Sequence, residues 1–551
     1  MEKLISEFVS TQILVVGAGG AGIRAAITAA DKNKKVLLIS ESEVGDSGST
    51  FYPLSYEWGM LFAEDEEDAE CFYQEILSAS GECMNQRLAR KLAYDSKEAY
   101  EQMCREGIRF VPMTELGIVG CFGKKSRGAF GCDRQEIIQA QKTALAKRNN
   151  IKIRSDLSVV SLLVRDQICY GAVAVNPEGR LLAIYAKAVV MACGGGEGLY
   201  EFGTSYGRLY GGAYAMAARH GARLVNLEFI QFVHGSVQPI KGINYYPFSY
   251  EELPDVYNSK MEKCLQDYLP SDITEEECLL AHAKHGPFST DSKGKYLEYA
   301  MIGEYQKGNG AGLLIVPNKE RVHKKRYRLW NEFLKKYGLN ASASMQLFPF
   351  AQGFNGGILL HDDLSTDIQG LFACGESAGG CHGPNRMGGL CILATQVFGK
   401  AAGNAAAEFS DNEQTEILTH QECELLLRQE FGQEEIMSCT DPEKKIKQIR
   451  HIMQTYACLH RSEEGLSEAL KEIEKIQIQP LEHLGQKNTA SYFKTQNAAD
   501  AAKLILYSMK LRKESRGCHD RIDYPERDEK QTAMNWVTIK ENMLQGGPCN
   551  I

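Results

Sequence analysis

The sequence predicts an α/β protein whose N-terminal part is a Rossmann-like nucleotide-binding domain. An apolar run at 13–16 leads into glycines with G-x-G-x-x-G spacing, a helical segment and a second apolar run at 36–39. Two later apolar segments, within 171–196 and 371–376, also end in glycines, as strands of such a sheet do near a ligand. Charged amphipathic segments from 411 to 551 predict a helical C-terminal part.

Length and composition narrow the class further. The 551 residues are 44% apolar, which is enough for two to four structural units with real cores. The net charge of -9 is spread along the chain, so neither nucleic acid nor an anionic membrane is expected as a partner. The most apolar stretch, 13–30, carries Arg24 and four glycines, so no membrane span is expected.

Cysteine usage predicts the redox environment. The 17 cysteines are an odd number without any C-x-x-C spacing, and the first residues lack a basic region followed by an apolar core. We therefore expect a reduced, cytoplasmic protein. An iron-sulfur cluster or a structural zinc ribbon held within this chain is not expected.

The glycine motif is the first candidate ligand site. Gly17 permits a tight turn, Gly19 lets the backbone approach a pyrophosphate, and Gly22 allows helix and strand to pack closely. The free amides at the start of the following helix would face the phosphates. The position that usually carries a ribose-binding acid is Ser40, with Glu41 next, so the ribose contact is less firmly predicted than the phosphate contact.

The later segments distinguish between two dinucleotides. Residues 171–196 predict two strands around an Asn-Pro-Glu-Gly turn. A second apolar segment, at the start of LFACGESAGG from residue 371, ends at Gly375 and Glu376. A simple nicotinamide dehydrogenase would not need these late returns to the nucleotide site. They resemble the FAD-binding fold, which implies that Glu376 approaches the ribityl chain and that the next helix points its N-terminus at the flavin.

Three further blocks carry a specific resemblance. HGPNRMGGLCILATQVFGKAAG at 382–403, NLEFIQF at 226–232 and RKESRGCHDRIDYPERD at 512–528 are similar to signature blocks of the fumarate reductase, succinate dehydrogenase and L-aspartate oxidase flavoprotein family. Together with the glycine motif they span nearly the whole chain. The resemblance implies FAD and the following cofactor-site residues: Gly17, Gly19, Gly20, Ala21, Gly22, Ser40, Glu41, Ser49, Thr50, Ala192, Gly194, Gly195, Glu376, Leu390, Ile392 and Leu393.

The resemblance also implies a domain organisation. Residues 1–232 and 345–410 would form a discontinuous FAD-binding domain. Residues 233–344 resemble the α+β capping domain that closes over substrate in this family, and 411–551 would form the C-terminal helical domain. Within the last, residues 501–511 place apolar side chains on one helical face, and Gly517 is expected to end that helix. His519 and Arg521, just beyond, could contact the FAD-binding domain, but a surface histidine is the favoured interpretation of His519.

Arg386 is the main candidate for substrate binding. It matches the family arginine that clamps a substrate carboxylate beside the flavin, and a guanidinium suits a planar anion bidentately. The alternative is that Arg386 caps backbone carbonyls or pairs with an internal acid. The helix beginning near Leu390 would place a positive dipole end near the flavin, where reduction adds negative charge.

Departures from the family pattern limit the substrate prediction. Ser49 stands where members with covalent FAD carry a histidine, so we expect non-covalent FAD. The family histidine of QFHP falls on Val233, with His234 next, and another family histidine falls on Gln352. Fumarate or succinate is therefore not the safest prediction for the substrate.

Three histidines are candidates for managing the proton that accompanies hydride transfer: His234, His285 and His382. Taken singly, each is better explained by a structural or peripheral role. The leading hypothesis is an FAD-dependent reductase or dehydrogenase acting on a carbon–carbon bond next to a carboxylate. Its electrons would be exchanged with a separate iron-sulfur or other redox protein, and the chain could form an oligomer. The alternatives are an L-aspartate-oxidase-like amino acid oxidase, suggested by the STFY of 49–52, and a non-enzymatic electron-transfer subunit.

Overall fold

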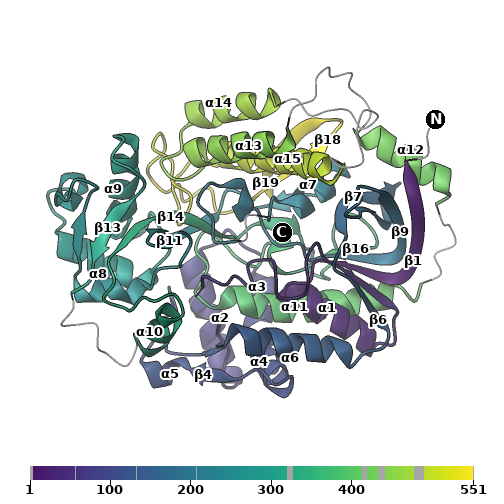
Figure 1. The fold of residues 1–551 in the computed structure, drawn as a ribbon, viewed down its shortest axis with the longest axis horizontal. Coiled ribbons are helices and arrows are strands. Elements are labelled where there is room, and N and C mark those ends of the chain that lie inside the picture. Colours follow the sequence, from purple (N-terminus) through teal and green to yellow (C-terminus); the bar gives the residue numbers. More distant parts are fainter. Residues whose placement is uncertain are drawn as a thin grey trace.

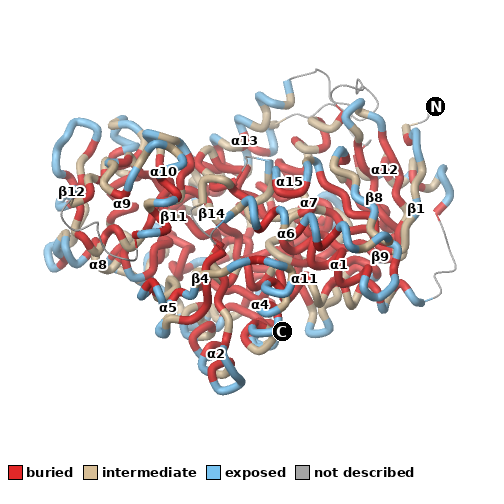
Figure 2. The backbone as a smooth tube through the Cα atoms, turned by 60° about the horizontal axis from the view of Figure 1, so that its bottom comes forward, coloured by how far each residue is buried: buried red, intermediate tan, exposed pale blue. Residues whose placement is uncertain are grey.

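A computed structural model describes residues 4–55, 58–131, 133–205, 208–318, 327–412, 418–431, 441–476 and 489–549. Figure 1 shows three regions: a large part centred on one sheet, a part at the left formed by residues of the middle of the chain, and a layer of C-terminal helices along the top. Figure 2 shows buried residues running through all three regions, with exposed residues on the outer helices and loops. The class is α/β, as the sequence predicts.

The largest sheet positions the nucleotide end of the site. Its seven strands run in the order β6-β2-β1-β9-β8-β7, with β16 beside β9. These strands are β1 (Ile5–Val16), β2 (Val36–Ile39), β6 (Ile151–Arg154), β7 (Ser158–Arg165), β8 (Ile168–Val175), β9 (Leu181–Met191) and β16 (Leu371–Ala373). The strands β1, β2, β6, β9 and β16 pair in parallel, so their carboxyl ends meet at one edge.

Two helices cross below this sheet in contact with each other (Figure 1). They are α1 (Gly20–Asp31) and α11 (Leu390–Phe409). Glycines of α11 allow the close approach, because a Cβ at Gly399 would lie 2.7 Å from the Ala21 carbonyl oxygen and one at Gly403 2.6 Å from that of Ala25. This packing brings the N-termini of both helices to the carboxyl edge of the sheet.

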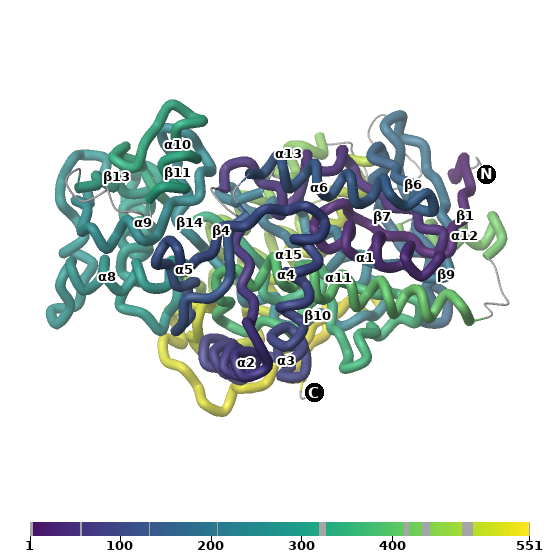
Figure 3. The backbone as a smooth tube through the Cα atoms, turned by 90° about the horizontal axis from the view of Figure 1, so that it is seen from below, coloured from purple at the N-terminus to yellow at the C-terminus, as the bar shows by residue number. Residues whose placement is uncertain are grey.

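Residues 58–131 and 133–146 form a smaller layer, which lies toward the viewer in Figure 3, where the molecule is seen from below. A three-stranded sheet in the order β3-β5-β4 lies here with several helices. The elements are β3 (Trp58–Met60), α2 (Glu66–Ser80), α3 (Gln86–Tyr94), α4 (Ser96–Arg105), β4 (Phe110–Pro112), α5 (Met113–Leu116), β5 (Ala129–Gly131) and α6 (Arg134–Ala146).

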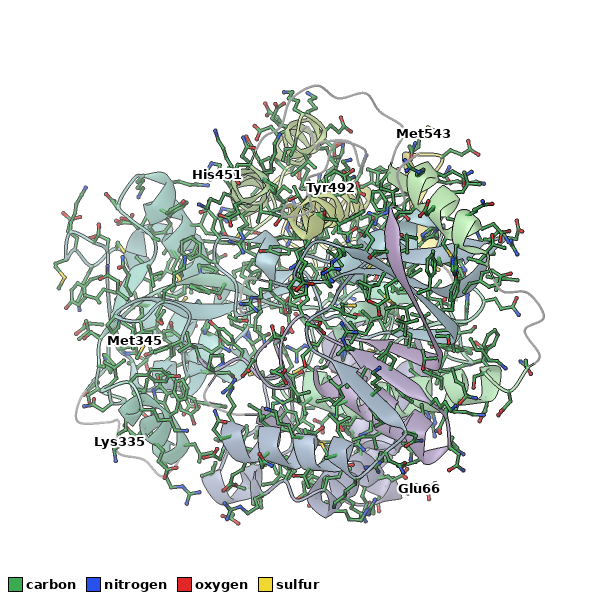
Figure 4. The ribbon with its side chains drawn as sticks, turned by 45° about the vertical axis from the view of Figure 1, so that its right-hand side comes forward. Glu66, Lys335, Met345, His451, Tyr492 and Met543 are labelled. Atoms are coloured by element: carbon green, nitrogen blue, oxygen red, sulfur yellow. The ribbon has the colours of Figure 1, made fainter. Side chains whose placement is uncertain are left out.

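The left-hand part contains a four-stranded antiparallel sheet with helices, as an α+β cap would. Its strand order is β11-β14-β13-β12. The elements are β11 (Ile230–Gln238), β12 (Asp255–Tyr257), α8 (Glu275–His285), α9 (Lys295–Gln306), β13 (Leu313–Val316), α10 (Arg328–Lys335) and β14 (Met345–Phe354). In Figure 4, Met345 and Lys335 mark this part, opposite Glu66 of α2. The expected boundary after 232 falls inside β11, because β11 and β14 form one continuous ladder.

The C-terminal part is helical as predicted and then ends in a hairpin. The hairpin consists of β18 and β19, and β18 pairs with β10. The hairpin thereby completes a five-stranded sheet in the order β17-β15-β10-β18-β19. The elements are α7 (Gly212–Arg219), β10 (Leu224–Val225), β15 (Gly357–Leu359), β17 (Ala378–Gly379), α12 (His420–Phe431), α13 (Pro442–Tyr456), α14 (Glu463–Glu474), α15 (Thr489–Leu511), β18 (Met534–Lys540) and β19 (Met543–Cys549).

Two local predictions for this part are wrong. The helix α15 ends at Leu511 and not at Gly517. His519 is fully buried instead of lying at the surface, with its Nδ1 2.7 Å from Arg461 Nη1. The reason is a buried ion-pair network in which Arg512 contacts Glu228 and Glu514 at 2.6 and 2.9 Å. The RKESRG block is therefore structural, since it pins the C-terminal part onto the chain around Glu228.

Candidate functional site

A cavity of about 490 Å³ lies at the carboxyl edge of the large sheet and extends to the α+β part. Its walls include Gly17 after β1, Ser40 after β2, Ala192 after β9 and Cys374 after β16. Ligands bind outside the carboxyl ends of such strands. The cavity contains most of the residues that the sequence predicts at a cofactor, namely Gly17, Gly19, Gly20, Ala21, Ser40, Glu41, Ser49, Thr50, Ala192, Gly194, Glu376 and Ile392.

The glycines at the start of α1 leave its N-terminus open toward the cavity. Gly17 has a φ of 110°, and a Cβ there would lie 2.2 Å from the Ala192 carbonyl oxygen. Gly19 is the N-cap of α1 without a side-chain cap, and the nearest atom to a Cβ at Gly19 is Thr50 Oγ1 at 3.6 Å. Gly22 does not line the cavity, because it faces the Gly17 carbonyl oxygen, 1.8 Å from the Cβ position. Close packing and open space are thus divided among the glycines as the motif requires.

The expected ribose position is held by polar contacts. Glu41 accepts a hydrogen bond from Ser158 Oγ at 2.6 Å and forms an ion pair with Lys494 at 2.8 Å. The Ser40 amide donates to the Arg154 carbonyl oxygen at 2.9 Å. Both Ser40 and Glu41 line the cavity, so the carboxylate of Glu41 is within the region where a ribose would lie.

A pair of buried carboxyl groups lies behind the middle of the cavity. Ser49 Oγ donates to Glu197 Oε1 at 2.8 Å, while Glu376 Oε1 accepts from the Phe354 amide at 2.7 Å. Burial, followed by the charge of Glu376, raises the pKa of Glu197 well above its ordinary value. Burial also raises the pKa of Glu376, although Arg386 opposes that shift. Two like charges in one apolar site resist simultaneous ionisation, so the surroundings of this pair favour a form that shares one proton.

The N-terminus of α11 faces the cavity at the other end. Gly389 is its N-cap with a φ of 94° and no side-chain cap, and Gly388, Gly389 and Ile392 line the cavity. Leu390 and Leu393 are fully buried behind this surface and do not line it. Gly195 likewise stays outside the lining, because its Cα faces the carboxyl group of Glu376, 2.7 Å from a Cβ position. These three predicted cofactor residues have supporting positions.

Arg386 is buried in the cavity wall just before α11. Its Nη2 donates to Gln352 Oε1 at 3.0 Å and its Nη1 donates to the Met387 carbonyl oxygen at 3.3 Å. Within the part of the chain that the structure describes, no carboxylate forms an ion pair with it. A Cβ at Gly353 would lie 3.6 Å from Arg386 Nη2 and 3.8 Å from Glu376 Oε1, so Gly353 lies beside both side chains. The guanidinium thus has neutral partners and faces the cavity.

The three candidate histidines lie in different surroundings. His382 lines the cavity, and burial followed by the charge of Arg386 lowers its pKa to about 3. His285 does not line the cavity; its Nδ1 lies 2.7 Å from the Pro287 carbonyl oxygen, and burial lowers its pKa to about 4. His234 lines the cavity from β11, with its Nδ1 2.6 Å from Tyr250 Oη. Arg386, His382 and His234 therefore share one cavity, and His285 is set back from it.

Sequence reasoning missed several residues of this site. Glu197 follows the predicted Gly194–Gly196 turn directly, and its position after an apolar strand was the available signal. Tyr250, His282 and Glu298 contact His234 but come from separate elements, and spacing alone does not connect them. His282 precedes His285 by one helical turn, which was a weak signal for a histidine face on α8.

The residues present fit FAD at this cavity. An open α1 N-terminus would accept the pyrophosphate, the polar groups at Ser40 and Glu41 would reach the ribose, and the α11 N-terminus would face the flavin. The single cavity borders all three of these regions, so one extended dinucleotide could contact them together.

Comparisons with known proteins agree with this geometry. The FAD binding domain family model matches residues 12–244 and 294–392, and the model described as fumarate reductase flavoprotein C-term matches 446–545. An uncharacterized FAD-dependent oxidoreductase of Methanocaldococcus jannaschii is 31% identical over 532 residues, which cover 94% of each chain. A polypeptide of the fumarate reductase (CoM/CoB) of Methanothermobacter marburgensis, named as one of its subunits, is 26% identical, covering 95% of this chain and 96% of its own.

A solved structure is also similar over nearly the whole chain. It is a point variant of FrdA from the Escherichia coli quinol fumarate reductase, with a TM-score of 0.80 and 24% identity, covering 99% of this chain and 97% of that one. At this identity the likeness speaks for the fold. Among the described residues, no helix combines the length and apolarity needed to cross a membrane.

Proposed function

Since this chain belongs to the FAD-dependent flavoprotein family of fumarate reductase and succinate dehydrogenase, we propose that it transfers a hydride between flavin N5 and a carbon–carbon bond of a small carboxylate-bearing molecule. Bound FAD would supply the hydride chemistry. The chain's own residues would hold the substrate acid group, exclude water and control one proton.

The observation that carries the proposal is the environment of Arg386. A buried guanidinium without a carboxylate partner is unfavourable unless an anion compensates its charge. The two hydrogen-bond acceptors of Arg386, Gln352 and the Met387 carbonyl oxygen, are neutral, and both Arg386 and Gln352 line the cavity. A substrate carboxylate would complete the compensation. The alternative, in which Arg386 caps backbone carbonyls, holds for one guanidinium nitrogen, because Nη1 donates to the Met387 carbonyl oxygen.

The residues around Arg386 indicate a chemical class of substrate. Val233 and Gln352 stand where the family pattern has histidines, so the groups that would hold a second carboxylate are changed. Gln352 supplies an amide toward the same space as Arg386 and suits a neutral polar group as well as an acid. We infer a substrate with at least one carboxylate and with a double bond, or a saturated bond, adjacent to it.

A separate redox partner belongs to the proposal. The sequence has no C-x-x-C spacing for a cluster of its own. The relative from Methanothermobacter marburgensis carries the name of one subunit of an enzyme, which supports electron exchange with another protein. The proton would reach the substrate from Tyr250, whose Oη lies 2.6 Å from His234 Nδ1, since His382, with its pKa lowered to about 3, is a neutral base poorly suited to donate.

The reductase proposal is tested by the fate of the reduced flavin. The FAD-loaded protein is reduced anaerobically with dithionite and mixed in a stopped-flow instrument with a panel of 2-enoates, and separately with oxygen. We expect at least one enoate to reoxidise the flavin faster than air does, with formation of the saturated acid. Rapid reaction with oxygen releasing peroxide, together with reduction by an amino acid, would instead identify an oxidase. Reaction with neither, but with a redox protein, would identify a component that only transfers electrons.

A further inference from the structure

A buried cluster of two histidines and one carboxylate lies in the cavity wall opposite the nucleotide end. His234 comes from β11, His282 from α8 and Glu298 from α9. Their exposed fractions are 3%, 1% and 1%. Each offers one ligand atom, and these atoms all lie within 4.8 Å of one another. Three separate elements of the α+β part thus converge on one point.

Hydrogen bonds alone leave this cluster incompletely satisfied. His234 Nε2 and His282 Nε2 both face the same oxygen, Glu298 Oε1, at 3.1 and 2.9 Å. Among the described residues, two buried polar atoms of the cluster have no hydrogen-bond partner, His282 Nδ1 and Glu298 Oε2. The contact of His234 Nε2 is within ion-pair distance but is not aligned as a hydrogen bond. Buried polar atoms in native proteins are nearly always paired, so two orphans in one cluster call for a ligand.

The composition of the cluster suits a cation. It offers one carboxylate and two imidazole nitrogens, and an ionised carboxylate and neutral imidazoles are the forms that bind a metal ion.

The surroundings of His234 also match a ligating histidine. Its Nδ1 lies 2.6 Å from Tyr250 Oη, so this second ring nitrogen has a fixed oxygen partner while Nε2 is directed at the cluster. Metal-bound histidines ordinarily donate their other N–H to an oxygen, which fixes the tautomer and the ring orientation. The rings of His234 and His282 stack at a centroid distance of 4.2 Å, an arrangement that directs both Nε2 atoms the same way.

We propose that His234, His282 and Glu298 bind one divalent transition-metal cation of the zinc or iron type. Two imidazoles and one carboxylate form a three-ligand set that leaves coordination positions open. His234, His282 and Tyr250 line the same cavity as Arg386. A cation here would therefore face a bound substrate from the side away from the nucleotide. A role of this cation as a Lewis acid toward a substrate oxygen rests on the proposed function. The binding of the cation does not.

The test measures metal directly, on FAD-loaded protein freed of any purification tag. Metal content is determined by plasma mass spectrometry after growth with zinc or with iron, and the chelator-treated protein is titrated with Co²⁺ while its d–d absorption is followed. We expect about one cation per chain in the natural protein. Glu298→Gln and His282→Gln should weaken Co²⁺ binding by roughly a hundredfold while retaining FAD, since each removes a ligand. His382→Gln, a buried cavity histidine outside the cluster, is the matched control and should bind Co²⁺ normally.

A second measurement covers the case in which a variant fails to fold. The melting temperature of the natural, chelator-treated protein should rise on addition of Zn²⁺ or Fe²⁺ and fall back with chelator, because a ligand of the native state stabilises it. The proposal is overturned if the natural protein binds no cation at millimolar concentrations, or if Glu298→Gln and His282→Gln bind Co²⁺ as tightly as the control. Either result is independent of enoate turnover, so failure here is distinguishable from failure of the reductase proposal.

Discussion

The two ends of the cavity are built in different ways. The nucleotide end consists of backbone: glycines after β1, the open start of α1 and strand ends of a parallel sheet. The opposite end consists of side chains that contact one another. His234 comes from β11, His282 from α8 and Glu298 from α9, and Tyr250 contacts His234. A backbone site depends on a few glycines and tolerates little change in them. A side-chain site can be rebuilt residue by residue, so substrate choice can change while the cofactor site stays the same.

The largest effect on FAD binding is expected at the nucleotide end, where substitutions of two glycines distinguish close packing from phosphate binding. Gly22→Ala would place a Cβ 1.8 Å from the Gly17 carbonyl oxygen, so we expect a protein that fails to fold or to bind FAD. Gly19→Ala meets nothing nearer than 3.6 Å and has an ordinary φ of -79°. It should leave the melting temperature of the FAD-free protein unchanged and reduce FAD binding at least tenfold, about 1.4 kcal/mol, if pyrophosphate approaches there.

The flavin content of both variants is measured in the supernatant after acid precipitation, which releases non-covalent FAD. Colour left in the pellet of the natural protein would contradict the interpretation of Ser49. Full FAD binding by Gly19→Ala would show that the phosphates lie elsewhere.

A smaller and pH-dependent effect is expected between the two ends, at Glu197 and Glu376. Both carboxyls have raised pKa values, so their contribution to stability is present below their unfolded pKa and is lost as pH rises through the folded one. Glu197→Gln removes one charge that must otherwise ionise in an apolar site. We expect it to be near neutral at pH 5 and increasingly stabilising toward pH 9, since the natural carboxyl must ionise in an apolar site as the pH rises and the amide does not.

The check is the melting temperature of the FAD-loaded protein between pH 5 and pH 9. Glu178→Gln, at an exposed position, serves as control and should follow the natural protein at every pH. Parallel curves for Glu197→Gln and the natural protein would mean that the pair does not hold a proton near neutral pH.

The same contrast explains what could be predicted from the sequence. The last four residues of the strands that precede Gly17, Ser40 and Ala192 are apolar and buried, and the glycine and polar residues that follow them reveal the site. At the other end, a register shift between Gln231 and Phe232 changes how β11 presents Val233 and His234. A bulge of this kind re-aims side chains without leaving a sequence signature.

Contacts between residues far apart in the sequence could not be predicted for a similar reason. Glu197 and Glu376 interact although each follows a different strand, and Glu298 reaches His234 only because α9 packs beside α8 and against β14, the partner of β11. Spacing along one element predicts a shared face. It does not predict which elements of an inserted α+β part converge.

The central claim is that Arg386 holds an acid group beside the flavin, and binding of a small carboxylate tests it most directly. The oxidised, FAD-loaded protein is titrated with malonate or crotonate while the flavin absorbance is followed. We expect a saturable spectral change in the natural protein and affinity at least tenfold weaker in Arg386→Lys, because a point charge replaces a bidentate fork. Arg208→Lys, at another arginine lining the cavity, should bind normally. Equal affinity in Arg386→Lys and the natural protein, with FAD retained in both, would contradict the account.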